Sequence, residues 1–147
     1  MNYESLRLDK QLCFPLYVAS KEVVSRYKPF LDEIDLTYTQ YITMMVMWEN
    51  NTVSVKELGE HLHLDSGTLT PLLKRLQSKG YVRRHRSKDD ERVVFISITD
   101  EGKKLKEKAT SIPEKMMKCM NLDAKEAVLL YKLLYKVIDS SHCLDDQ

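Results

Sequence analysis

The sequence predicts a mainly α-helical fold that contains a winged helix-turn-helix, and three observations support this prediction. Apolar residues recur at helical spacing through most of the 147 residues. The stretch 64–79 carries an apolar stripe on one side and small or basic side chains on the other. Two short strands, 81–87 and 92–98, follow it around a polar turn. A helix followed by a basic hairpin is the pattern of a winged helix-turn-helix.

The first long helix is predicted to begin near Phe14, with Cys13 at its N-terminus. Apolar residues from Leu8 to Tyr27 step by three or four. Pro15 fits only the first turn of a helix, because proline in a helix interior costs ~3 kcal/mol. For the same reason the stretch 27–29, which closes with a proline, is expected to end this helix.

Two capping boxes predict the next two helices. The Thr-x-x-Gln sequence at 37–40 opens a largely apolar helix that runs through residue 49. The Ser-x-x-Glu sequence at 54–57 opens a short helix that reaches about residue 62. The short helix is interpreted as the first helix of the helix-turn-helix, and 64–79 as the second, the recognition helix.

The recognition helix has clear start and stop signals. Asp65 is a good N-cap, and Gly80 suits the position just after the helix end. Its outer face is small, hydroxylated and basic, and short enough to enter a DNA major groove. Taken alone, the stretch is equally compatible with an ordinary amphipathic surface helix. The outer face holds Gly67, Thr70, Pro71, Lys74, Arg75 and Ser78.

The distribution of charge favours a DNA-reading helix over an ordinary surface helix. The range 74–92 holds eight Lys or Arg and three Asp or Glu, a net charge of +5, whereas the whole chain carries +1. A basic stripe on a nearly neutral protein is the electrostatic footprint of duplex DNA binding. Arg83 must face away from Arg84 and Arg86, because neighbouring side chains on a strand point to opposite faces.

Two further helices are predicted after the wing. Thr99 caps a polar helix that runs past Lys108, and the Ile-Pro pair at 112–113 kinks or divides this helix. Asp123 caps the last helix. The first helix and the two C-terminal helices form an apolar set outside the DNA-reading module. The sequence allows a monomeric helical layer or a dimer interface. We favour the dimer, because one recognition helix reads only one half-site.

Composition places the chain as a single cytoplasmic domain. The first ten residues are polar, and no apolar run approaches the ~20 residues of a membrane helix. Three widely spaced cysteines, Cys13, Cys119 and Cys143, are neither a disulfide framework nor a C-x-x-C pair. His61 and His63 diverge on a helix and have no evident third ligand, so no metal site is expected.

Several motifs in combination resemble the MarR family of bacterial transcription regulators. They are the range 65–75, the Asp-Glu-Arg turn at 90–92 and the Ile-Thr-Asp-Glu-Gly sequence at 98–102. The Gln-Leu-Cys-Phe sequence at 11–14 resembles the OhrR branch, which senses organic hydroperoxides. The resemblance covers about 8–138. It implies one MarR-type domain over 1–147, with a winged helix-turn-helix at about 37–99 and dimerisation helices at about 7–30 and 100–142.

The resemblance also implies a function. A homodimer would bind double-stranded operator DNA, most simply as a repressor, without enzymatic activity or a cofactor. Arg92 is expected to reach the minor groove, and Asp90 is expected to brace the wing by pairing with an arginine. The remaining residues predicted to bind DNA are Asp65, Ser66, Gly67, Thr68, Thr70, Lys74, Arg75, Arg84 and Arg86.

Cys13 is the predicted redox sensor. The N-terminus of a helix favours a thiolate, although a lone cysteine in an apolar helix is more often an inert core residue. The resemblance implies that the hydroxyls of Tyr27 and Tyr38 hydrogen-bond the Cys13 sulfur across a subunit boundary, and that Tyr17 lines the pocket. A hydroperoxide would oxidise Cys13 to a sulfenic acid, and the altered packing would release the DNA.

The partner of oxidised Cys13 is left open by the sequence. Cys119 resembles the resolving cysteine of two-cysteine OhrR proteins and is our preferred candidate. Cys143 lies in a polar tail, and an external small thiol is the third possibility. Two other functions remain: a repressor released by a small aromatic ligand bound among the same tyrosines, and a thiol peroxidase. The basic wing and the absence of a thioredoxin-like thiol site argue against the peroxidase.

Overall fold

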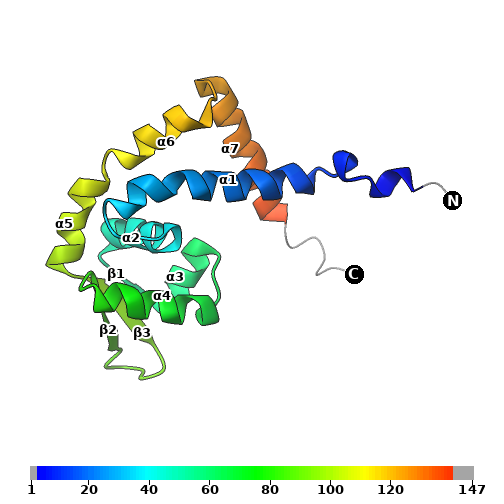
Figure 1. Ribbon diagram of the computed structural model, residues 1–147. Coiled ribbons are helices and arrows are strands. Elements are labelled where there is room, and N and C mark those ends of the chain that lie inside the picture. The colour runs from blue at the N-terminus through cyan, green and yellow to red at the C-terminus, as the bar shows by residue number, and fades with distance from the viewer. Residues whose placement is uncertain (1–2, 141–147) are drawn as a thin grey trace. The chain divides into compact units, whose positions relative to one another are not determined.

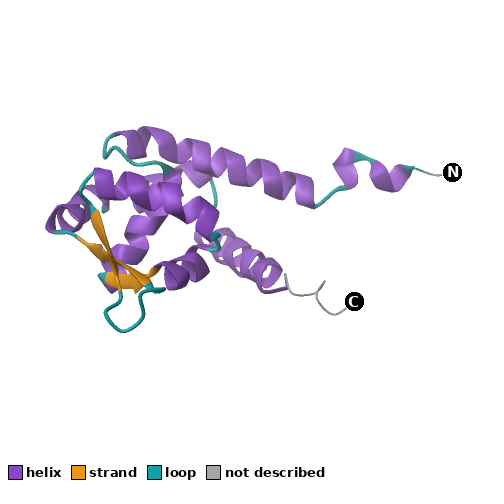
Figure 2. Cartoon of the chain, turned by 90° about the horizontal axis from the view of Figure 1, so that it is seen from below, coloured by secondary structure: helices purple, strands orange, loops and turns teal. Residues whose placement is uncertain are grey.

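Helices account for most of the residues that the computed structural model describes, 3–140, together with one small antiparallel sheet (Figures 1 and 2). This confirms the predicted fold class. The chain divides into two compact units, 1–112 and 113–147. The elements in order are η1 Glu4–Leu6, η2 Leu8–Lys10, α1 Cys13–Asp32, α2 Tyr38–Asn50, β1 Thr52–Ser54, α3 Val55–Leu62, α4 Ser66–Ser78, β2 Val82–Arg86, β3 Val94–Ile98, α5 Asp100–Ala109, α6 Ile112–Met120 and α7 Ala124–Asp139.

Helix α1 begins at Cys13, as predicted, but it runs to Asp32 instead of ending at residue 29. Pro29 lies inside it and removes one backbone hydrogen bond. Burial of the following apolar residues offsets this loss, since Leu31 and Ile34 are 2% and 6% exposed. The helix ends where the Leu36 N–H bonds the Leu31 carbonyl, with Asp35 between them in the left-handed region.

Both capping boxes are confirmed. Thr37 and Gln40 cap α2, and Ser54 and Glu57 cap α3, each pair bonding the other's backbone N–H. The sequence prediction missed strand β1, which is too short to show an alternating pattern. It exists because it pairs with β3, with Val53 opposite Ile96.

The α4 helix is the second helix of the helix-turn-helix and has the predicted ends. The Asp65 carboxylate accepts the Thr68 N–H at 2.8 Å. At the other end the Tyr81 N–H bonds the Leu76 carbonyl, and Gly80 takes a φ of 79°, which a side chain would strain. Its apolar stripe is buried: Leu69, Leu72, Leu73 and Leu76.

The sheet has the order β1-β3-β2 and forms the wing, drawn in orange in Figure 2. Val82 and Ile96 are buried on the face of the sheet turned toward the helices. Arg84 lies opposite Ile96 in the ladder, and Arg86 lies opposite Val94, so both arginines are on this face. Arg83 lies on the other face, as predicted.

Three helices follow the wing. Thr99 caps α5 by accepting the Gly102 N–H at 3.1 Å. Residues 110–111 form a turn between α5 and α6. In the second unit, Asp123 and Glu126 form a capping box at the start of α7. No helix within 3–140 is long and apolar enough to cross a membrane. Helix α7 exposes a row of large apolar side chains: Val128, Leu129, Leu130, Leu133, Leu134, Val137 and Ile138.

Candidate DNA interface and redox site

The outer face of α4 is open along its length. The residues predicted to enter the major groove are all exposed in the described chain. Asp65 already serves as the N-cap, and its backbone hydrogen bond with Thr68 is the main cause that lowers the pKa of its carboxyl group. The exposed set is Asp65, Ser66, Gly67, Thr68, Thr70, Lys74 and Arg75.

Arg84 connects the wing to the recognition helix. Its Nε donates to Gln77 Oε1 at 2.7 Å, which fixes the guanidinium beside the end of α4. Arg86 instead donates from Nη1 to the Glu91 carbonyl at 2.7 Å and thereby supports the wing turn. The sequence analysis missed Gln77, because an exposed glutamine on a helix gives no signal until the neighbouring strand is placed.

Asp90 and Arg92 form a pair at the tip of the wing. Arg92 Nε and Nη2 lie 3.1 and 3.2 Å from the two Asp90 carboxylate oxygens, and the Arg92 backbone N–H donates to Asp90 at 3.0 Å. The side-chain bond with Arg92 is the main cause that lowers the pKa of Asp90. The Arg92 side chain remains 91% exposed, so its charge faces solvent while its direction is fixed.

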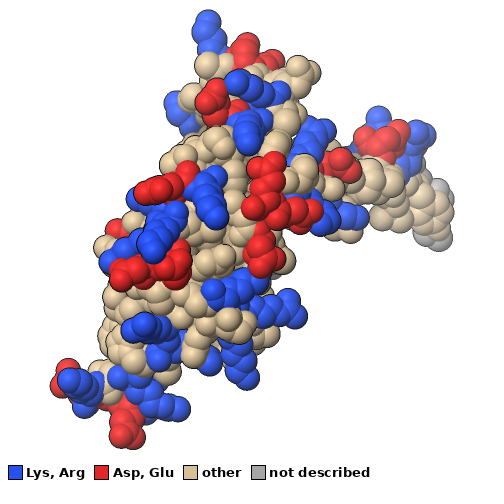
Figure 3. All heavy atoms as spheres, turned by 60° about the vertical axis from the view of Figure 1, so that its left-hand side comes forward, with Lys and Arg blue, Asp and Glu red and all other residues tan. Residues whose placement is uncertain are grey.

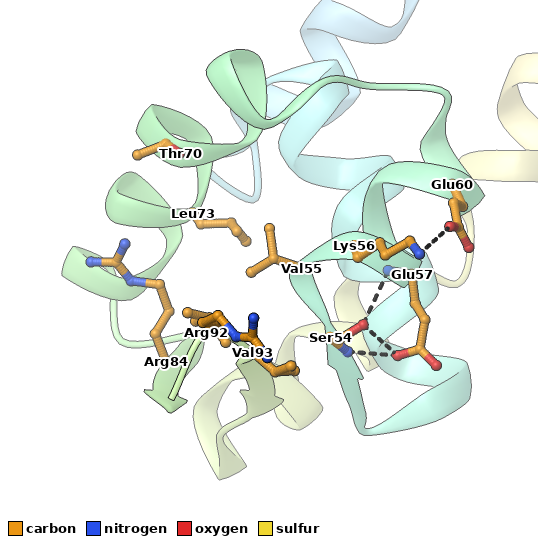
Figure 4. Close-up of a pocket in the computed structure, with 11 residues that line it drawn as sticks. Ser54, Val55, Lys56, Glu57, Glu60, Thr70, Leu73, Arg84, Arg92 and Val93 are labelled. Atoms are coloured by element: carbon orange, nitrogen blue, oxygen red, sulfur yellow. Dashed lines mark hydrogen bonds and ion pairs between the residues drawn. The ribbon is translucent and has the colours of Figure 1, made fainter. Parts of the chain in front are cut away.

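A groove of about 640 Å³ lies between α3, α4 and the wing (Figure 4). Thr70 and Leu73 line it from α4, and Arg84 and Arg92 line it from the wing. The structure therefore brings the predicted residues of the helix and the hairpin to one surface. Figure 3 shows Lys and Arg side chains over the lower part of the view, with Asp and Glu side chains beside them at the tip.

The predicted sensor residues separate into two groups in a single chain. Cys13 is the exposed first residue of α1, and Tyr17 lies one turn further on, with Lys21 Nζ 5.0 Å from its ring centre. Tyr27 and Tyr38 lie together, with ring centres 4.9 Å apart. Tyr27 follows Cys13 by 14 residues on the same helix, a rise of about 21 Å at 1.5 Å per residue.

Burial shifts the titration of the tyrosine pair. It raises the pKa of Tyr27 and of Tyr38, and the neighbouring phenols Tyr38 and Tyr41 raise that of Tyr27 further. A tyrosine phenol is protonated at neutral pH even without such a shift, so both hydroxyls can donate a hydrogen bond. The sequence analysis missed Tyr41, although its position three residues after Tyr38 puts it on the same side of α2.

Comparison with known proteins decides the family. The sequence pattern of the transcriptional regulator SarA/Rot family matches residues 25–109. The chain is 43% identical over 140 residues, 95% of each chain, to the organic hydroperoxide resistance transcriptional regulator of Bacillus subtilis. It is 46% identical over 127 residues, 86% of each chain, to the regulator SarZ of Staphylococcus aureus. The chain is a MarR/SarA-type transcription regulator.

Solved structures agree with this assignment. Reduced AbfR bound to DNA superposes with a TM-score of 0.76 at 34% identity, covering 95% of this chain and 97% of AbfR. A disulfide-formed structure of AbfR, a protein of Staphylococcus epidermidis, gives a TM-score of 0.64 at 35% identity, covering 92% and 95%. The OhrR resemblance seen in the sequence is thereby confirmed, and the chain is a DNA-binding regulator with no indication of a catalytic family.

Of the two remaining thiols of this MarR/SarA-type regulator, the structure describes one. Cys119 is exposed on α6, in the second unit. Cys143 lies outside the described residues. His61 lies in the last turn of α3, and His63 takes the left-handed position after the helix. Within 3–140 no group of three or more His, Cys, Asp or Glu side chains gathers as for a metal ion.

Proposed function

We propose that this regulator binds operator DNA as a homodimer and leaves it when an organic hydroperoxide oxidises Cys13. The Bacillus subtilis relative is named for organic hydroperoxide resistance, and AbfR has been solved in reduced, DNA-bound and in disulfide-formed states. In the absence of oxidant the regulator acts as a repressor.

The DNA-binding half of the proposal assigns α4 to the major groove and Arg92 to the minor groove. Thr70 on the outward face of α4 and Arg84 of the wing line the same groove as Arg92. A dimer presents two such surfaces to half-sites about 34 Å apart, one helical turn of DNA. The exposed apolar row on α7 and the exposed Phe14 and Val18 of α1 supply the interface.

The observation that carries the sensor half is the distance between Cys13 and the tyrosine pair. A separation of about 21 Å along α1 prevents Tyr27 from reaching Cys13 within one chain. A second copy whose α1 runs alongside in the opposite direction brings its own Tyr27 and Tyr38 to this Cys13. Two protonated phenols then donate to the sulfur and stabilise its charged form.

The oxidation step uses the thiolate as nucleophile. The Cys13 sulfur attacks the outer peroxide oxygen, the O–O bond breaks, and the alkoxide takes up a proton and leaves as an alcohol. The sulfur loses two electrons and becomes a sulfenic acid, while the peroxide gains them. The added oxygen displaces the tyrosine hydroxyls from the sulfur, and the change in packing moves the recognition helices apart.

A disulfide completes the switch. The thiolate of Cys119 from the second copy attacks the sulfenic sulfur, an S–S bond forms, and the displaced hydroxide takes up a proton and leaves as water. The bridge requires the Cα atoms of the two cysteines to lie within about 7 Å of each other.

A DNA mobility shift with the protein's own upstream region tests the proposal. Addition of cumene hydroperoxide should release the wild-type protein and leave Cys13→Ser bound. Cys143→Ser is the matched control, because it removes a thiol that the proposed switch does not use. Release of Cys13→Ser by peroxide would contradict the assignment. Release of that variant by a small aromatic acid instead would favour a ligand-operated repressor.

A further inference from the structure

We propose that Trp48 couples the tyrosine pair to the point where the recognition helix passes into the wing. The connection is an aromatic ladder made of Tyr27, Tyr38, Tyr41 and Trp48. This inference rests on the proposed function, because it describes how oxidation of Cys13 reaches the DNA-binding surface.

The ladder is continuous across α1 and α2. The ring centre of Tyr27 lies 4.9 Å from that of Tyr38 and 5.8 Å from that of Tyr41. Tyr41 in turn meets Trp48 edge-on, at 6.3 Å between ring centres. These spacings are those of favourable aromatic pairs. Tyr41 is 3% exposed, so it has no room to move without moving a neighbour.

Trp48, at the end of the ladder, makes a hydrogen bond outside the ladder. Its Nε1 donates to the Gly102 carbonyl at 2.8 Å, across 54 residues of sequence, and so joins α2 to the first turn of α5. Trp48 is half-buried, and its indole nitrogen can only donate a hydrogen bond. Loss of this bond would therefore leave a half-buried donor unsatisfied. The position of the indole and the position of Gly102 are therefore linked.

Gly102 is in close contact with the exit from α4. A Cβ at Gly102 would lie 2.3 Å from the Tyr81 carbonyl oxygen, so the two backbones touch with no space for a side chain. Two hydrogen bonds hold this contact: Thr99 Oγ1 donates to the Gly80 carbonyl at 2.5 Å, and the Thr99 N–H donates to the Tyr81 carbonyl at 3.1 Å. A shift of the first turn of α5 therefore displaces Gly80 and Tyr81.

Gly80 and Tyr81 set the angle between the recognition helix and the wing. Tyr81 closes α4 through its N–H bond to Leu76, and the next residue begins β2. Displacement of Tyr27 or Tyr38 on oxidation thus passes through Tyr41 and Trp48 to the hinge of the DNA-binding surface. Packed interiors respond by stepping between discrete arrangements, which allows a small shift to change the geometry of this hinge.

Trp48→Phe tests the ladder in the full-length protein. Phenylalanine keeps an aromatic ring against Tyr41 but cannot donate to Gly102. Asn50→Ala is the matched control, because it removes a hydrogen bond within α2, from Nδ2 to the Val46 carbonyl at 2.9 Å, that does not cross to α5. For each protein we would measure operator affinity before and after cumene hydroperoxide, and the extent of Cys13 oxidation by mass spectrometry.

Wild type and Asn50→Ala should lose operator affinity on oxidation by a factor within the usual allosteric range of about 5 to 150. Trp48→Phe should be oxidised to the same extent, and its affinity should fall by a clearly smaller factor. An equal fall in Trp48→Phe, with Cys13→Ser still insensitive to peroxide, would overturn the ladder alone. Release of Cys13→Ser by peroxide would overturn the sensor and the ladder together.

Fluorescence gives a second test that needs no substitution in the ladder. Trp48 is the one tryptophan of the sequence, so its emission reports this position directly. Oxidation should change the emission of the wild-type protein and leave that of Cys13→Ser unchanged. Oxidised wild-type protein that has left the operator with unchanged emission would overturn the proposal, whether or not Trp48→Phe folds.

Discussion

Asp90 holds Arg92 at the tip of the wing with both carboxylate oxygens, at 3.1 and 3.2 Å, yet leaves the guanidinium almost fully exposed. An exposed ion pair contributes little to folding. The arrangement instead restricts the conformations of the Arg92 side chain in the free protein. Less conformational entropy is then lost when this side chain enters a DNA groove.

Arg92→Ala should weaken operator binding by ~1–3 kcal/mol if the side chain makes a specific groove contact. Arg83→Ala is the control, because Arg83 is also basic and exposed but lies on the face of the sheet that points away from Arg84. Fluorescence anisotropy over a range of salt concentrations measures both. Equal effects of the two substitutions, or unchanged affinity in Arg92→Ala, would show that the wing does not bind DNA in this way.

The N-cap of the recognition helix should make stability depend on pH. Hydrogen bonding to Thr68 lowers the pKa of Asp65 in the folded protein below its unfolded value. The carboxylate therefore adds stability above its ordinary pKa of about 4, and this contribution is lost as the pH falls through the lowered value. Asp65→Ala should melt at a lower temperature than wild type at pH 7. The difference should shrink in strong acid, and a difference that stays constant down to pH 3 would contradict this role of the charge.

The elements that the sequence predicted well are those whose signals are local. The capping residues Thr37, Ser54, Asp65, Thr99 and Asp123 each act within three residues of themselves. The errors came from distant contacts. The end of α1 was wrong because burial of Leu31 and Ile34 outweighs the loss at Pro29, and β1 was missed because its partner β3 lies some 40 residues later.

In the candidate site, too, the local signals could be predicted and the distant contacts could not. Arg84 could be predicted from the basic strand, whereas its bond to Gln77 depends on how β2 packs beside α4. Tyr27 and Tyr38 were selected by family resemblance, and the ladder that continues through Tyr41 to Trp48 and Gly102 depends on the packing of α1, α2 and α5. A linear pattern does not contain such three-dimensional relationships.

The fate of the sulfenic acid can be read on non-reducing gels. Brief treatment with cumene hydroperoxide should give a covalently linked dimer in the wild-type protein. Cys119→Ser should abolish this species, and Cys143→Ser, the matched thiol control, should retain it. The reverse pattern would assign the bridge to Cys143. A wild-type protein that is oxidised and released without any linked dimer would indicate an external thiol.

The central claim is that each sensing site is built from two copies of the chain, and a mixed dimer tests it most directly. One copy carries Cys13→Ser, and the other carries Tyr27→Phe together with Tyr38→Phe. If the site is shared, this dimer keeps one complete site, with Cys13 of the second copy facing the intact tyrosines of the first. If the site lies within one chain, neither site is complete.

The measurement is operator release from the purified mixed dimer, followed by anisotropy as cumene hydroperoxide is added, beside the two parent homodimers. The account predicts that the Cys13→Ser parent stays bound, that the double tyrosine parent responds weakly, and that the mixed dimer is oxidised at half of its sites at the wild-type rate and released. A mixed dimer that responds no better than the double tyrosine parent would contradict the shared site and, with it, the proposed switch.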